Sequence, residues 1–93
     1  LQDNLEYEQL NLVIQFKSNL VLEQEDLILH INNHDMNELE KLSHRIAGAA
    51  QMFGFTKLSS LAVNLELAIK QDDLDKVTNL SQALLNEIDL VLW

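Results

Sequence analysis

The sequence contains no cysteine and no proline, and only two of its 93 residues are glycine. Without cysteine the chain can form no disulfide, no thiol nucleophile and no cysteine-rich metal site. Aromatic residues are also few, at 5%, while leucine dominates the apolar residues. Because helix breakers are nearly absent and strand-forming residues are sparse, the composition predicts an all-α fold.

Basic residues are scarce as well, since six Lys and Arg stand against 15 Asp and Glu, which gives a formal net charge of -9. Binding to nucleic acid or to an acidic membrane surface needs clustered positive charge, so we expect no nucleic-acid partner and no membrane contact. No apolar run approaches the length of a membrane span, and no basic leader precedes an apolar stretch. The segment is therefore predicted to be soluble.

The chain is long enough for one compact core and too short for two, with 47% apolar side chains over 93 residues. No internal repeat, linker or low-complexity tract interrupts it. We therefore predict a single domain over residues 1–93. Because the first residue is Leu1 and not methionine, we interpret the chain as a piece of a longer protein or a processed product.

Four helix starts are indicated by a side-chain oxygen that can accept from the amides of a first turn, with a polar or acidic residue three places on. These pairs are Asp3 with Glu6, Asp35 with Glu38, Thr56 with Ser59, and Asp72 with Asp75. They predict helices over about residues 4–33, 36–53, 57–71 and 73–92. The first is long enough to kink near residues 23–26.

Each predicted helix carries apolar residues at helical spacing along one face. In chain order these are Leu10, Val13, Ile14, Phe16, Leu20, Val21, Leu27, Ile28 and Ile31; then Leu39, Leu42, Ile46, Ala49, Ala50 and Phe53; then Leu58, Leu61, Ala62, Leu65, Ala68 and Ile69; then Leu74, Val77, Leu80, Leu84, Ile88 and Val91. Gly54 suits the left-handed position after a helix end. One apolar face per helix and short connections predict an antiparallel up-down four-helix bundle.

A histidine on the second predicted helix is the candidate for chemistry. On a helical wheel His44 lies roughly opposite the apolar face, so its imidazole should face water. Its neighbours on that face are Asn37, Lys41, Gly48 and Gln51. Glycine in an exposed helix interior costs about 1 kcal/mol relative to alanine. Gly48 therefore indicates a surface that another molecule approaches closely.

An exposed imidazole is largely neutral at neutral pH and can attack a phosphoryl group without a general base. The chain has no glycine-rich phosphate loop, so we expect the donor to be a partner protein and not a nucleotide bound by this domain. That partner, with its Mg²⁺, would supply positioning and charge neutralisation. The alternative is that His44 is an ordinary surface histidine without a role.

The stretch HRIAGAAQMFGF, from His44 to Phe55, is followed by Leu58, Leu61 and the pair Leu65-Glu66. With Asp35 and Leu39 upstream, it resembles the histidine-containing phosphotransfer (HPt) family, whose pattern is H-x-[LI]-K-G, a small-residue run, a second glycine and a leucine-rich helix ending in L-E. The resemblance covers the second and third helices closely and the outer helices only by pattern. It implies a four-helix bundle whose exposed histidine, here His44, exchanges a phosphoryl group with aspartates of response-regulator receiver domains in His-Asp phosphorelays.

The sequence departs from the family pattern at Ala47, where the family usually has a lysine whose charge can steady the phosphoryl group. Lys41 and Arg45 lie near His44 and could substitute for it. Gln51 corresponds to a position where a polar side chain can hydrogen-bond the imidazole or the phosphoryl oxygens. The expected docking surface consists of Ala47, Gly48 and Gln51, with an acidic rim that orients the partner.

Two interpretations of His44 follow from the resemblance. In the first, the domain is a phosphocarrier without catalytic apparatus of its own, so that no cofactor is expected in the domain and Mg²⁺ is expected on the receiver. In the second, it is a degenerate HPt domain or another helical interaction module that binds a partner without carrying phosphate, an option that Ala47 keeps open. The parent could be a hybrid sensor histidine kinase, with this chain as its C-terminal domain, or a free-standing carrier. We expect a cytoplasmic monomer, tethered if its parent is membrane-bound.

His30 and His34 are four residues apart, a spacing that can bind a metal on one helical face, and Asp35 is adjacent. Histidines in the last turn of a helix also interact favourably with the helix dipole and need no metal. The paired Glu-x-x-His motifs of helical metal-binding bundles are absent from the sequence. We therefore predict no metal site.

Overall fold

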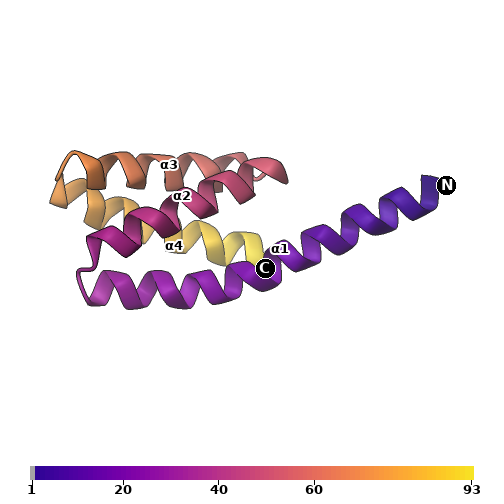
Figure 1. The fold of residues 1–93 in the computed structure, drawn as a ribbon, viewed down its shortest axis with the longest axis horizontal. Helices are drawn as coiled ribbons and strands as arrows, with labels where there is room; N and C mark the ends of the chain where they lie inside the picture. The colour runs from indigo at the N-terminus through magenta and orange to yellow at the C-terminus, as the bar shows by residue number, and fades with distance from the viewer. Residues whose placement is uncertain (1) are drawn as a thin grey trace.

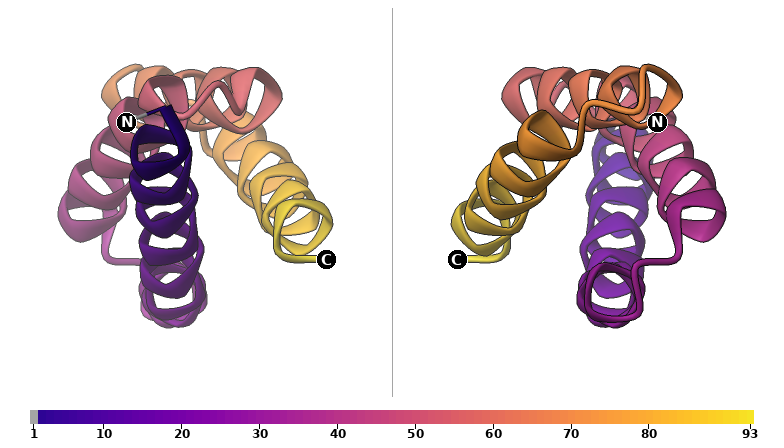
Figure 2. Two further views of the ribbon diagram at one scale, coloured as in Figure 1. Left: turned by 90° about the vertical axis from the view of Figure 1, so that its right-hand side faces the viewer. Right: turned by 90° about the vertical axis from the view of Figure 1, so that its left-hand side faces the viewer.

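The computed structural model describes residues 2–93, with side chains from Glu6 onward. Its helices are α1 (Gln2–Asn32), α2 (Met36–Met52), α3 (Thr56–Lys70) and α4 (Leu74–Leu92). Successive helices run in opposite directions, and α4 returns beside α1 (Figures 1 and 2). Contacts join α1 to α2, α2 to α3, α3 to α4 and α4 back to α1. This arrangement confirms the predicted antiparallel up-down four-helix bundle.

Local side-chain chemistry explains both ends of α2. The Asp35 carboxylate accepts a hydrogen bond from the Glu38 amide at 3.3 Å, as predicted for the start of this helix. After the helix, Gly54 has φ +80°, the left-handed conformation that a residue with a Cβ rarely adopts. The predicted stop of α2 at Gly54 is therefore confirmed, and it turns the chain directly into α3.

The predicted starts of the other helices are less accurate. Asp73, and not Asp72, caps α4, because its carboxylate accepts from the Lys76 amide at 3.2 Å while Asp72 lies in the turn with φ +53°. Thr56 is the first residue of α3, and the capping position before it makes no side-chain hydrogen bond. The helix α1 already includes Asp3, whose side chain lies outside those described.

The core lies where the four helices face one another. Phe16 closes one end of it, with its ring centroid 5.2 Å from those of Phe53 and Phe55. The buried apolar residues are Phe16, Leu20, Leu27, Leu39, Leu42, Ile46, Ala47, Ala50, Leu58, Ala62, Leu65, Ala68, Ile69, Val77, Leu84 and Ile88. Their burial stabilises the bundle through the hydrophobic effect.

The helix α1 is much longer than its neighbours, at 31 residues against 15 to 19. Its N-terminal part extends beyond the bundle (Figure 1), so there it has no helix to pack against. Four residues predicted on its apolar face, Leu10, Ile14, Val21 and Ile28, are in fact 44–59% exposed, and Leu74 on α4 is also exposed. The helix is continuous through residues 23–26. Even so, none of the helices in the described part of the chain is long and apolar enough to cross a membrane.

Candidate functional site

His44 lies in the middle of α2, on the side of the helix that faces away from the core. Its side chain is 77% exposed, as the helical wheel predicts. The reason is local, because Leu39, Leu42 and Ile46 are buried and hold the opposite face of α2 against the other helices. The imidazole is therefore accessible to another molecule.

One ring nitrogen of His44 is nevertheless held by a residue of the next helix. His44 Nδ1 lies 2.8 Å from Glu66 Oε2, and the Glu66 side chain is only 15% exposed. An ionised carboxylate can only accept a hydrogen bond, so Nδ1 donates and carries the ring proton. In the neutral imidazole the lone pair is then on Nε2, the other ring nitrogen.

The same carboxylate has a second partner. Lys70 Nζ lies 3.9 Å from Glu66 Oε1, so Glu66 stands between the imidazole of α2 and an ammonium group of α3. The sequence pattern did not point to Lys70, and Glu66 entered it only as part of the Leu65-Glu66 pair. The four-residue spacing of Glu66 and Lys70, which places both on one face of a helix, is the signal that could have linked them.

These residues line a hollow of about 440 Å³ on the surface between α2 and α3. Its full lining is Glu40, Lys41, His44, Arg45, Glu66 and Lys70. The structure thus brings the predicted site residues Lys41 and Arg45 together with His44. Lys41 also pairs with Glu38 on its own helix, at 3.5 Å.

Two other predicted site residues lie elsewhere. Ala47 was expected on the docking surface, but it is 8% exposed and belongs to the core. Its carbonyl accepts a hydrogen bond of 2.9 Å from the Ser59 hydroxyl of α3, so this position faces the neighbouring helix. Gln51 is exposed but lines a different hollow, together with residues of α3 such as Thr56 and Val63.

Gly48 is exposed, one turn after His44. A Cβ added to it would meet no atom within 4 Å, and its φ is not in the left-handed region. Neither crowding nor backbone conformation within this chain therefore requires glycine at position 48. This observation supports the interpretation that the bare backbone serves an approaching molecule.

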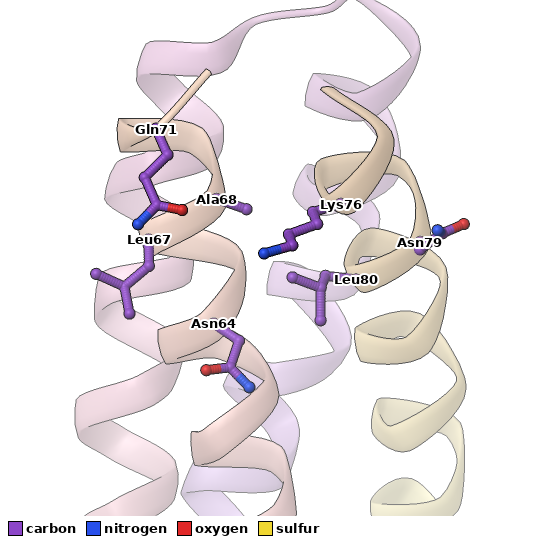
Figure 3. Close-up of a pocket in the computed structure, with 7 residues that line it drawn as sticks. All are labelled: Asn64, Leu67, Ala68, Gln71, Lys76, Asn79 and Leu80. Atoms are coloured by element: carbon purple, nitrogen blue, oxygen red, sulfur yellow. The ribbon is translucent and has the colours of Figure 1, made fainter. Parts of the chain in front are cut away.

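Two other regions have features of a site, namely the histidines at the end of α1 and a hollow between α3 and α4. His34 lies in the turn after α1 with φ +52°, so it does not share a helical face with His30, and the described residues contain no group of three or more His, Asp or Glu that could hold a metal. A hollow of about 510 Å³ lies between α3 and α4 (Figure 3). Lys76 points between the two helices there, among the amides of Asn64 and Gln71. The residues that line this second hollow include no histidine.

Glu23 on α1 is the one described residue whose protonation is clearly perturbed. Burial raises the pKa of its carboxyl, the Arg45 guanidinium partly opposes that effect by lowering it, and Asp26 adds a small increase. The carboxyl of half-buried Glu23 thus interacts electrostatically with Arg45, which itself lines the hollow at His44.

Comparison with known families agrees with this geometry. The chain matches the Hpt domain family over residues 11–92 and belongs to that family. Membership supports a histidine phosphotransfer role in a phosphorelay and interaction with receiver domains. No curated protein and no solved structure matches the chain. The match begins at residue 11, within α1.

The contact between Glu66 and His44 can be tested through the tautomer of the ring. In Glu66→Gln a neutral amide oxygen replaces the stronger carboxylate acceptor, so the ratio of Nδ1-protonated to Nε2-protonated imidazole should fall about threefold to tenfold. Imidazole ¹⁵N NMR measures that ratio. Glu87→Gln is the matched control, because Glu87 is 13% exposed and pairs with Lys57 at 3.6 Å. Unchanged His44 signals in Glu66→Gln would contradict the contact.

The raised pKa of Glu23 predicts a pH-dependent stability. Above that pKa the ionised carboxylate destabilises the fold, whereas below the ordinary glutamate pKa it is protonated in both folded and unfolded chains and the penalty disappears. Glu23→Gln should therefore raise the urea midpoint near neutral pH and have little effect below about pH 4. Glu25→Gln, on the exposed side of the same helix, is the control. A gain that persists unchanged at acidic pH would refute this explanation.

Proposed function

We propose that this chain relays a phosphoryl group between aspartates of receiver domains through Nε2 of His44. The observation that carries the proposal is the hydrogen bond from Nδ1 to Glu66, which leaves the outward nitrogen of a 77% exposed ring with a free lone pair. Membership of the Hpt family supplies the reaction class. In this role the chain is a phosphocarrier without catalytic apparatus of its own.

The transfer step involves one bond made and one broken. The Nε2 lone pair of His44 attacks the phosphorus of an aspartyl phosphate on the receiver, and the bond between phosphorus and the aspartate oxygen breaks. The aspartate leaves with the electron pair as a carboxylate. The ring, which keeps its Nδ1 proton, becomes cationic, and the Glu66 carboxylate stabilises that charge at 2.8 Å. Transfer to a second receiver reverses these events.

The partner receiver supplies the metal ion for the transfer, which this chain does not bind. Phosphoryl transfer depends on positioning and charge neutralisation, for which Mg²⁺ on the receiver is proposed, with no cofactor bound by this chain. Gly48 and the hollow beside His44 give the receiver access to the ring. We also propose that the chain works as a cytoplasmic monomer, either as a domain of a hybrid sensor histidine kinase or as a free-standing carrier.

One observation favours a second candidate function. The position where the family usually has a lysine is the buried Ala47 in this chain. A degenerate HPt domain that binds a partner without carrying phosphate would not need that charge. The two candidates differ in whether His44 takes up a phosphoryl group.

Phosphorylated receivers provide the test. After incubation with the chain, intact mass should show an acid-labile phosphoryl adduct, and His44→Asn should abolish it. His34→Asn is the control, because His34 is also exposed and asparagine tolerates its φ of +52°. An adduct that persists in His44→Asn refutes the assignment of the site. No transfer from a panel of receivers favours the interaction module.

The role of Gly48 predicts opposite effects on stability and transfer. Because a Cβ at this helical position meets open space, Gly48→Ala should stabilise the isolated chain by about 0.5–1 kcal/mol in urea unfolding. The same methyl group should slow transfer from a receiver, since it occupies the surface next to His44. Gln82→Ala, on the exposed side of α4, is the control that should leave transfer unchanged. Undiminished transfer by Gly48→Ala would show that the receiver does not approach there.

A further inference from the structure

Positive charge is concentrated around His44 to a degree that the overall composition does not suggest. Of the six Lys and Arg residues in the chain, three line the hollow at His44, namely Lys41, Arg45 and Lys70. They stand there against two carboxylates, although the whole chain carries a net charge of -9. A phosphoryl group adds about two negative charges at neutral pH, so these cations are placed where that charge would arise.

The three cations differ in what they already contact. Lys41 pairs with Glu38 one turn away on α2, at 3.5 Å. The positive charge of Arg45 attracts the carboxylate of Glu23 on α1 and thereby lowers the pKa of that carboxyl, although the two side chains form no ion pair within 4 Å. Both thus already interact with a carboxylate outside the hollow.

Lys70 is different, because among the residues whose side chains the structure describes its one ion-pair partner is Glu66, the residue that holds the imidazole. The distance of 3.9 Å is too long for a hydrogen bond, so the donors of the ammonium group are not used by Glu66. The Lys70 side chain is 55% exposed and can turn toward the ring.

We propose that Lys70, from α3, is the residue that neutralises the phosphoryl group on Nε2 of His44. It would thereby supply from the neighbouring helix the positive charge that Ala47 does not provide on α2. This inference rests on the proposed function. Phosphorylation would shift the Lys70 ammonium from its loose pairing with Glu66 to hydrogen bonds with phosphoryl oxygens, while Glu66 keeps the Nδ1 proton of the ring.

A small phosphodonor tests this without a cognate receiver. We would label the full chain with ammonium phosphoramidate and follow the phosphoryl adduct on His44 by intact mass. Lys70→Gln should label about fivefold to tenfold more slowly than the wild type, the effect of one lost charged hydrogen bond at a partly exposed site. Lys70→Arg should keep most of the rate because it keeps the charge, and Lys57→Gln, which breaks a remote ion pair with Glu87, should label normally.

The outcomes separate this inference from the proposed function. Labelling of Lys70→Gln at the wild-type rate, or of Lys70→Arg as slowly as Lys70→Gln, would overturn the role of Lys70 while leaving His44 as phosphoacceptor. If neither phosphoramidate nor phosphorylated receivers label the wild type, the proposed function fails and this inference fails with it. High salt should slow the wild type toward the rate of Lys70→Gln, because ions screen the attraction.

Lys70 also lies in the last turn of α3, where a cation stabilises a helix whatever its other role. A thermodynamic cycle distinguishes the two effects. Urea unfolding in the cold would be compared for phosphorylated and unphosphorylated chains, in the wild type and in Lys70→Gln. Phosphorylation should shift the urea midpoint upward in the wild type relative to its effect in Lys70→Gln. Equal shifts in both chains would show that Lys70 acts only on the helix.

Discussion

The packing of α2 against α3 is the constraint on which the site depends. Small residues are buried on both helices, among them Ala47 and Ala50 on α2 and Ala62 on α3, so that the two backbones can approach closely. The Ser59 hydroxyl of α3 donates to the Ala47 carbonyl at 2.9 Å and fixes the register of one helix against the other. Glu66 lies two turns after Ser59 on the same helix, and this register brings its carboxylate to His44.

This interface also explains why the imidazole can be both exposed and ordered. An exposed histidine on an isolated helix would sample several rotamers, and its proton would exchange between the two nitrogens. Glu66 is nearly buried at the edge of the interface, so the ring is held on its inner side by Nδ1 and presents Nε2 outward. The orientation of the ring is therefore a property of two helices together.

The site at His44 also depends on how charge is distributed over the chain. A chain with a net charge of -9 repels anions at long range, which is unfavourable for the phosphoryl transfer proposed for His44. Half of its Lys and Arg side chains are gathered at the one hollow that contains His44, which makes the local field differ from the overall one. In the proposed role the acidic remainder of the surface orients the partner, while the hollow would receive the transferred group.

Much of the fold could be predicted because its determinants are local. Apolar spacing predicted four helices, Asp35 and Gly54 marked both ends of α2, and the opposition of His44 to the buried face predicted its exposure. These local patterns gave wrong predictions where two adjacent residues could both cap a helix, and where no second helix packs against an apolar face. Asp72 and Asp73 are both plausible caps, and apolar residues such as Ile14 stay exposed because no other helix covers that face of α1.

The sequence by itself determined the helices, the acidic character of the chain and the face on which His44 stands, since each follows from residues a few positions apart. Only the tertiary structure decided which side chains meet that histidine. Glu66 is 22 residues away in the chain and Lys70 lies further still, and which face of α3 turns toward α2 depends on packing among distant residues. The same packing placed Ala47 inside, because a position three residues after His44 on the helix faces α3 and not water.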